Sequence, residues 1–295
     1  MNKDNYEEIY IVDAIRTAVG NFNGTISSLS AHKLGETLIR SLVTRNKLYP
    51  DSVNEVIIGQ VLTGGVGQNP ARQAMINAGI DKEVPAFTIN QVCGSGLRSV
   101  ALGYQSILVG NSDMVIAGGQ ESMSQSCHSI FLRNGLRMGD GKLTDMMILD
   151  GLTDAFNMYH MGITAENIAE EFSISRQEQD EFSVKSQNKA EAAQKSLRFK
   201  DEIIPVTIET KTGPIIFDQD EFIRPGVNID SLAKLRPAFK KDGTVTAGNA
   251  SGINDGAAMV LLVKKSLAEK LSLTPLAKIV AFADAGVSPH IMGTG

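Results

Sequence analysis

The first 120 residues alternate short apolar runs of strand length with longer stretches of helical periodicity. The strand-like runs occupy residues 9–12, 56–58, 86–89 and 114–117. The helical stretches between them occupy residues 30–44, 69–78 and 95–109. Because each helix of this kind has an apolar side to lay on a sheet, the alternation predicts a layered α/β domain over residues 1–120.

The composition changes after residue 120. Residues 121–247 are richer in Met, Ser, Gly and Asp, which predicts an inserted subdomain or loop region whose clearest element is a helix opening at the Ser175 capping box. From residue 248 we expect a second α/β region. Its strands are predicted at 257–263 and 277–283, with a short helix between them. The predicted domains are therefore 1–120, 121–247 and 248–295.

Charge and cysteine content narrow the classes of function. The net charge is −5 and no block of Lys or Arg occurs, so nucleic-acid binding is not expected. The longest apolar runs are too short for a membrane span, and the N-terminus lacks the apolar core of a signal peptide, which favours the cytoplasm. Cys93 and Cys127 have no zinc-like spacing with histidines, so they are expected to be free thiols and no metal is expected.

Cys93 lies where the sequence passes from a strand to a helix. The strand-like run at 85–89 is followed by the residues NQVCGSGLR at 90–98, in which Gly94 and Gly96 permit a sharp turn. A thiol at a helix N-terminus is favoured as the nucleophilic thiolate by the helix dipole and by unpaired N–H groups. The alternative is a buried structural cysteine, the usual fate of a free thiol.

Five motifs in the same order resemble those of the thiolases. The segment NQVCGSGL at 90–97 resembles the nucleophile segment of that family. The other four are IVDAIRT at 11–17, AGGQESMS at 117–124, MGITAE at 161–166 and TAGNASGINDGAA at 246–258. Together they span nearly the whole chain, which is thus identified as a member of the thiolase family, of the acetyl-CoA C-acetyltransferase type.

The resemblance implies a fold and a reaction. The expected fold is the layered α/β/α/β/α thiolase fold, with a complete first half-domain and an incomplete second one. In thiolases a cysteine attacks acetyl-CoA to form an acyl-enzyme, and a second acetyl-CoA condenses with it to acetoacetyl-CoA, or the reverse occurs. No metal or redox cofactor is implied, because the CoA thioester is itself the substrate. CoA and short-chain acyl-CoA are the implied partners, and a homo-oligomer is expected for the family.

The resemblance also assigns roles to individual residues. Cys93 matches the acylated nucleophile. The residues that match the CoA-binding site are His160, Met161, Arg224, Ala247, Gly248, Ser251 and Met292. His160 matches a histidine that lines the CoA pocket, and Met161 and Met292 match residues at the acyl end. Arg224 matches the adenine end, and Ser251, with Ala247 and Gly248 before it, matches the contacts to pantetheine. Taken by their local patterns alone, His160 fits a structural histidine, Ser251 a turn residue and Arg224 a surface residue.

Three family segments do not occur in the 295 residues: Asn-Glu-Ala-Phe, a histidine followed by proline, and a second cysteine in a Cys-x-Gly context. In thiolases they supply an oxyanion site, the base for the nucleophile and the acid/base for condensation. Losing one oxyanion donor costs about 10²- to 10³-fold in rate. We therefore expect a C-terminally truncated chain with little or no turnover.

Three other interpretations stay open at this point. The first is a non-catalytic remnant that binds CoA or pairs with a full-length subunit. The second is a degradative 3-ketoacyl-CoA thiolase, which the sequence does not separate from the biosynthetic type. The third is a ketoacyl synthase of the same broad fold, which the long region at 121–247 disfavours.

Overall fold

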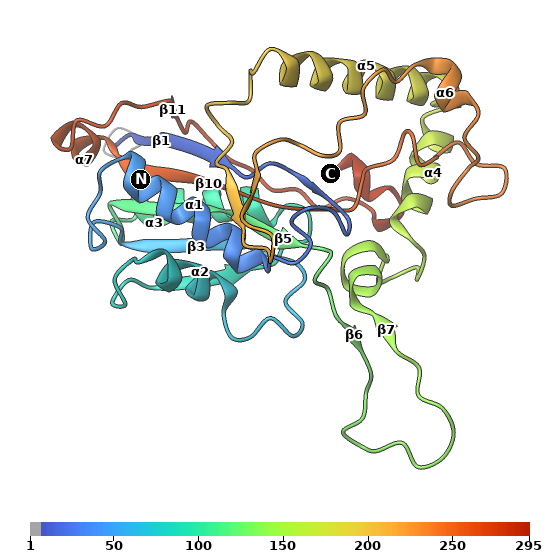
Figure 1. The fold of residues 1–295 in the computed structure, drawn as a ribbon, viewed down its shortest axis with the longest axis horizontal. Helices are drawn as coiled ribbons and strands as arrows, with labels where there is room; N and C mark the ends of the chain where they lie inside the picture. Colours follow the sequence, from blue (N-terminus) through green and yellow to red (C-terminus); the bar gives the residue numbers. More distant parts are fainter. Residues whose placement is uncertain (1–6) are drawn as a thin grey trace. The chain divides into compact units, whose positions relative to one another are not determined.

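The computed structural model describes residues 7–295, which form two compact units (Figure 1). Unit 1 contains the described residues up to Ser126 together with Lys200–Asp220 and Asn254–Phe282. Unit 2 contains Cys127–Phe199, Glu221–Ile253 and Ala283–Gly295. The chain therefore passes repeatedly from one unit to the other.

Unit 1 is built on a seven-stranded sheet with the order β11-β1-β10-β5-β3-β4, and β2 pairs with β10. The strands are β1 (Ile9–Arg16), β2 (Gly20–Asn21), β3 (Glu55–Gly59), β4 (Ala86–Ile89), β5 (Met114–Ser122), β10 (Asn254–Lys264) and β11 (Ala277–Lys278). Strands β3, β4 and β5 are parallel, whereas β10 runs antiparallel to both β1 and β5. The carboxyl ends of β3, β4 and β5 therefore meet at one edge of the sheet.

Helices cover both faces of this sheet. The helices of unit 1 are α1 (Ala31–Arg45), α2 (Pro70–Ala78), α3 (Ser95–Leu108) and α7 (Lys265–Lys270). Along β5 the side chains of Met114 and Ile116 join the core under α1 and α2, and those of Val115 and Ala117 join the core under α3. This alternation follows from the two-residue period of a strand. The predicted layered α/β architecture is confirmed.

The structure divides the chain differently from the predicted boundaries. Residues from 248 onward were expected to open a second half-domain, but β10 pairs with β5 from Asp255 to Val263 and with β1 on its other side. The predicted strand at 257–263 is present within β10, and its partners β1 and β5 lie far away in the sequence. Of the strand expected at 277–283, only β11 forms, at the edge beside β1.

Part of the predicted insert also belongs to unit 1. Strands β8 (Val206–Ile208) and β9 (Ile215–Phe217) form an antiparallel pair. Val206, Ile208 and Phe217 are buried and contribute to the core under α1 and α2. The β8–β9 pair has a weak strand pattern in its sequence. It is stabilised by the burial of these three side chains in the core of unit 1.

Unit 2 consists mainly of helices and connecting segments. Its elements are β6 (His128–Ser129), β7 (Thr144–Asp145), η2 (Met147–Leu152), α4 (Met161–Glu171), α5 (Arg176–Lys195), α6 (Ile229–Ala233) and η3 (Pro289–Thr294). The predicted capping box opens α5: the Ser175 hydroxyl accepts the N–H of Glu178, and the Glu178 carboxylate accepts the N–H of Ser175. Residues 121–247 thus contain the predicted helix.

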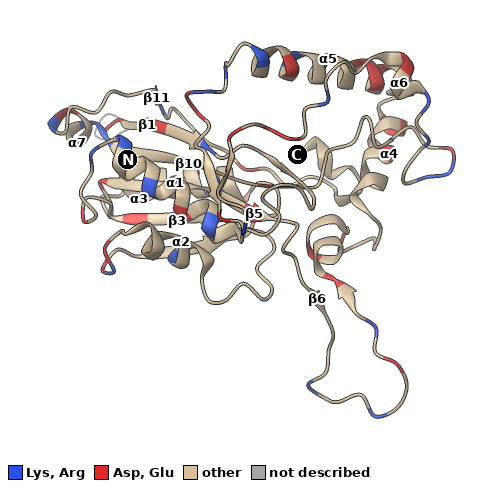
Figure 2. Ribbon diagram, viewed as in Figure 1, with Lys and Arg blue, Asp and Glu red and all other residues tan. Residues whose placement is uncertain are grey.

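Basic and acidic residues are interspersed along the chain rather than separated by sign into different elements (Figure 2). Within residues 7–295, every helix is too short or too polar to span a lipid bilayer.

Candidate functional site

The chain makes a tight turn around Cys93 between β4 and α3. Val92 has a φ of +47°, in the left-handed region that a β-branched residue rarely adopts. Its N–H donates to Asn90 Oδ1 over 2.8 Å. The buried Ser95 hydroxyl accepts the N–H of Gln91 over 2.8 Å and donates to the carbonyl of Val92 over 2.6 Å. The strained turn is therefore held by side-chain hydrogen bonds on both sides of Cys93.

Small residues bring the start of α3 close to the sheet. A Cβ on Gly59, at the end of β3, would lie only 2.4 Å from the carbonyl carbon of Ser95. A Cβ on Gly119, in β5, would lie 3.3 Å from the Cα of Gly96. The close approach places Cys93 at the carboxyl-end edge of the parallel strands, directly before a helix N-terminus.

Cys93 is a free and exposed cysteine. The alternative of a buried structural thiol therefore does not describe it, and its predicted position between strand and helix is found. The N-cap residue of α3 is Gly94, which has no side chain to accept the N–H groups of the first helical turn. An exposed thiol in front of such a turn has the arrangement of a nucleophile with N–H donors beside it.

Four of the predicted CoA-binding residues line one cavity in unit 2. The cavity has a volume of about 580 Å³. The predicted residues in its wall are His160, Met161, Ser251 and Met292. Met292 is carried by η3, which is tied to α4 by a hydrogen bond from the Asn167 amide to the carbonyl of His290.

The other three predicted residues line a second, smaller cavity of unit 2. Its volume is about 230 Å³, and Arg224, Ala247 and Gly248 contribute to its wall. Ala250 lines both cavities, so they share the segment that follows residue 246. The structure thus brings the seven predicted residues of unit 2 to two cavities, whereas Cys93 belongs to unit 1.

His160 is held firmly in the wall of the larger cavity. It is the N-cap of α4, and its Nδ1 accepts the N–H of Gly162 over 3.0 Å. Its ring stacks on Phe239, with centroids 4.7 Å apart and planes inclined by 18°. Burial lowers the pKa of His160, which favours the neutral ring. Because Nδ1 accepts a hydrogen bond, the neutral ring carries its proton on Nε2, which can donate to a ligand.

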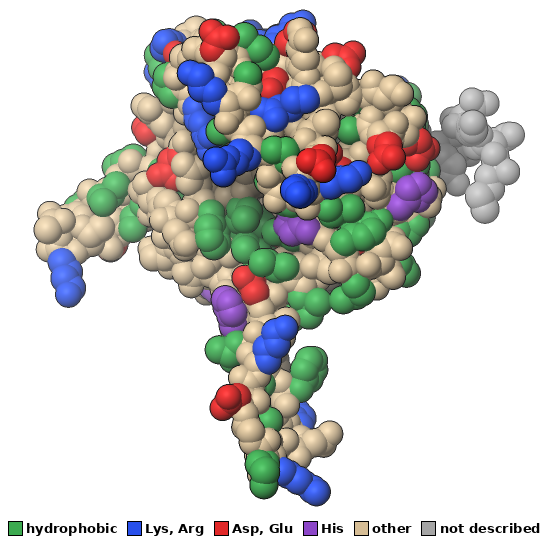
Figure 3. Space-filling view, turned by 90° about the vertical axis from the view of Figure 1, so that its right-hand side faces the viewer, with side chains coloured by type: hydrophobic (Ala, Val, Ile, Leu, Met, Phe, Trp, Pro, Cys, Tyr) green, Lys and Arg blue, Asp and Glu red, His purple; other side chains and the backbone are tan. Residues whose placement is uncertain are grey.

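Arg224 stands at the smaller cavity as an exposed cation. Its guanidinium lies 5.5 Å from the centroid of the Phe222 ring, which is within the range of a cation–π contact. Its backbone N–H donates to the Gln187 side chain of α5 over 3.0 Å. Hydrophobic side chains and a group of Lys and Arg side chains share the face of the molecule drawn in Figure 3.

Two residues of the larger cavity, Phe239 and Asn249, are not among those predicted from the sequence. Phe239 carries the stack on His160, and Asn249 lies in the wall between Gly248 and Ala250. Phe239 is distant from His160 in the chain, and its surrounding sequence has no motif that would mark it. Asn249 lies within the family motif at 246–258, and an asparagine in such a loop is a signal for a side chain that fixes the backbone.

Cys127 is partly buried in unit 2, and we assign it no chemistry. Within the described part of the chain, no cluster of three or more His, Cys, Asp or Glu residues could hold a metal ion. That no metal or other cofactor takes part stays a prediction.

An exposed cysteine at a strand-to-helix turn of an α/β sheet is typical of enzymes that work through a nucleophilic thiol. The family described as thiolase, N-terminal domain, matches residues 9–266 of the chain. The chain therefore belongs to the thiolase family, a class of acyltransferases, as its motifs predict. The matched range includes β10, which agrees with its place in the sheet of unit 1.

Individual relatives are similar over nearly the whole chain. An acetyl-CoA acetyltransferase of Allochromatium vinosum is 59% identical over 291 residues, which cover 98% of this chain and 74% of that protein. An acetyl-CoA acetyltransferase of Rhizobium meliloti is 56% identical over 287 residues. These residues cover 97% of this chain and 73% of that protein. The crystal structure of the Bacillus anthracis acetyl-CoA acetyltransferase has a TM-score of 0.95 at 37% identity, over 98% of this chain and 73% of that one.

Proposed function

We propose that the chain transfers the acetyl group of acetyl-CoA to Cys93. The observation that best supports this proposal is the exposed Cys93 at the N-terminus of α3, in a chain 59% identical to an acetyl-CoA acetyltransferase. The Cys93 thiolate attacks the thioester carbonyl carbon, a new carbon–sulfur bond forms, and the bond to CoA breaks. CoA leaves as a thiolate and takes up a proton. The first-turn N–H groups of α3 are suited to stabilise the oxyanion formed on the way.

Unit 2 is proposed to bind the CoA part of the substrate. The larger cavity is suited to the pantetheine arm, with His160, Met161 and Met292 toward the acyl end and Ser251 along the arm. The smaller cavity is suited to the nucleotide end, because the Arg224 cation can pair with phosphate groups there. Short-chain acyl-CoA thioesters are therefore the proposed ligands, with no further cofactor.

The complete reaction proposed is the condensation of two acetyl-CoA molecules to acetoacetyl-CoA and CoA, or its reversal. The 295 residues contain no histidine followed by proline and no second cysteine in a Cys-x-Gly context. We therefore propose that this chain is acylated at Cys93 but turns over slowly by itself. A homo-oligomer is proposed by family resemblance, and the cytoplasm is proposed because the free thiol of Cys93 suits a reducing compartment.

Mass spectrometry of the purified 295-residue chain after incubation with acetyl-CoA tests the proposal. We expect one acetyl group, on the peptide that contains Cys93. Cys93→Ser should abolish the modification, and the matched control Cys127→Ser should keep it. Binding of CoA without acetylation would refute acyl transfer and favour a non-catalytic remnant. Thiolysis of acetoacetyl-CoA at rates usual for enzymes would refute the slow turnover.

A further inference from the structure

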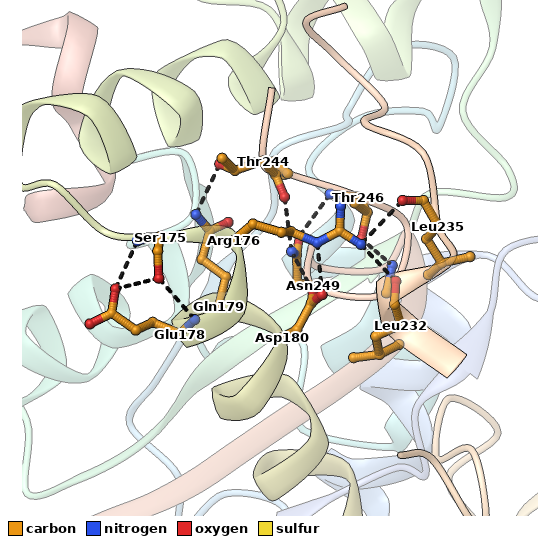
Figure 4. Close-up of polar contacts among 12 residues, drawn as sticks. Ser175, Arg176, Glu178, Gln179, Asp180, Leu232, Leu235, Thr244, Thr246 and Asn249 are labelled. Atoms are coloured by element: carbon orange, nitrogen blue, oxygen red, sulfur yellow. Dashed lines mark hydrogen bonds and ion pairs between the residues drawn. The ribbon is translucent and has the colours of Figure 1, made fainter. Parts of the chain in front are cut away.

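A buried polar network in unit 2 joins α5, α6 and the segment at 244–249 (Figure 4). Arg176 Nε donates to Asp180 Oδ2 over 2.7 Å, and both residues lie near the start of α5. Arg176 Nη2 donates to the carbonyls of Leu232 and Leu235, over 2.6 and 3.1 Å. The Arg176 guanidinium thus binds α6, through Leu232, and the chain just beyond α6, through Leu235, to α5.

Asp180 continues the network to the segment shared by the two cavities. Its Oδ1 accepts the amide of Asn249 over 2.9 Å. The same amide group donates to the carbonyl of Thr244 over 3.1 Å, and Asn249 Oδ1 accepts the N–H of Thr246 over 2.7 Å. Every polar atom of the Asn249 side chain is therefore engaged, and a carboxylate in its place could not donate.

The same segment is also held by apolar contacts. A Cβ on Gly248 would lie 2.5 Å from Leu235 Cδ1 and 2.6 Å from Leu232 Cδ2. The backbone at Gly248 is therefore pressed against the two leucines whose carbonyls Arg176 binds. Arg176 sets the position of the two leucines, and Asp180 sets the position of the loop through its bond to Asn249. Because Arg176 and Asp180 both belong to α5, both restraints depend on that helix.

The burial of α5 is consistent with a positioning role. This helix has 20 residues, and Asp180 is the one among them that is buried. Its side chain is 3% exposed, and that of Arg176 is 25% exposed. A buried charge is costly unless it is paired, and an apolar pair of similar volume is often at least as stabilising. The pairing of Arg176 with Asp180 is therefore weak evidence for a gain in stability.

We propose that Arg176, Asp180 and Asn249 are positioning residues for CoA binding. They hold residues 247–251, each of which lines one of the cavities and of which Ala250 lines both, in the arrangement that accepts the pantetheine arm and the nucleotide end together. The inference rests on the proposed function, because it requires that the cavities bind CoA. None of the three residues needs to touch the reacting atoms.

Titration calorimetry with CoA compares the wild-type chain with Arg176→Lys. Lysine keeps the charge but has a single nitrogen, so it cannot replace the separate Nε and Nη2 donors. We expect the Kd for CoA to rise about tenfold, which corresponds to about 1.4 kcal/mol. The final extent of Cys93 acetylation at saturating acetyl-CoA should stay the same, because only binding is altered.

Arg72→Lys is the matched control. In unit 1, Arg72 likewise donates to two backbone carbonyls, those of Val84 and Lys82, over 2.6 and 2.8 Å. The same substitution there should lower Tm and leave the Kd for CoA unchanged. If folded Arg176→Lys binds CoA as tightly as the wild-type chain does, the network is only structural and the inference is overturned. If the wild-type chain does not bind CoA, the proposed function itself fails, and the inference fails with it.

A side-chain exchange provides an independent readout. Asn249→Asp sets one carboxylate against another and should weaken CoA binding more than Arg176→Lys does. The double variant Asp180→Asn with Asn249→Asp restores an amide-to-carboxylate hydrogen bond and should recover part of the affinity. Recovery of affinity supports direct coupling between the two positions. A double variant that binds CoA no better than Asn249→Asp contradicts the inference.

Discussion

Replacing Ser95 with alanine tests how the turn presents Cys93. The Ser95 hydroxyl accepts from Gln91 N–H and donates to the Val92 carbonyl, so Ser95→Ala removes two hydrogen bonds. At about 1 kcal/mol for each bond, the loss is about 2 kcal/mol. Those bonds offset the cost of the left-handed backbone of Val92, which by itself is about 1–2 kcal/mol. The turn should therefore relax when the hydroxyl is removed.

The magnitude sets the expected kinetics. A shift of about 2 kcal/mol changes a two-state equilibrium by up to about thirtyfold, so Cys93 acetylation should slow by at most that factor. In a unit of this size the same loss lowers Tm by about 4–8 °C. The assay follows acetylation of Cys93 over time by mass spectrometry, with thermal unfolding measured on the same samples.

Ser99→Ala is the control for Ser95→Ala. The Ser99 hydroxyl is fully buried one turn further along α3 and donates to the carbonyls of Gly118 and Gly96, each over 2.7 Å. Ser99→Ala should lower Tm to a similar extent and leave the acetylation rate of Cys93 unchanged. Equal slowing in both variants, or no slowing in Ser95→Ala, would refute the reasoning that Ser95 holds the nucleophile turn.

Three further predictions concern the same two regions. Gly162→Ala places a Cβ 2.2 Å from the Phe239 ring, so it should cost about 1–3 kcal/mol by overpacking and weaken CoA binding measured by calorimetry. Because burial lowers the pKa of His160, the unfolded chain binds more protons, and stability should fall as pH falls from about 6.5 toward that lowered pKa. Thermal unfolding across this range should show a smaller pH dependence in His160→Gln. Val92→Gly removes the steric cost of a φ of +47° and should raise Tm slightly or leave it unchanged.

Local patterns in the sequence were sufficient for the elements that depend on neighbouring residues. The capping box at Ser175 and the turn at Cys93 were both predicted, because each is made by residues a few positions apart. The stack of Phe239 on His160 and the bonds from Arg176 to α6 were not predicted. Their partners are brought together only by the folding of unit 2, and no local signal marks them.

The boundary predicted at residue 248 illustrates the same limit at the level of the sheet. The apolar run of β10 is compatible with any sheet that offers it two neighbours, so its sequence indicates a strand and leaves the partners open. In the structure β10 lies between β1 and β5. Strand β1 comes from the start of the chain, and β5 comes from the end of the first α/β region. A chain that ended before residue 254 would leave both strands with unpaired backbone groups beside an apolar face. The sheet that positions Cys93 therefore cannot be completed until β10 is present, although β10 contributes none of the predicted catalytic or CoA-binding residues.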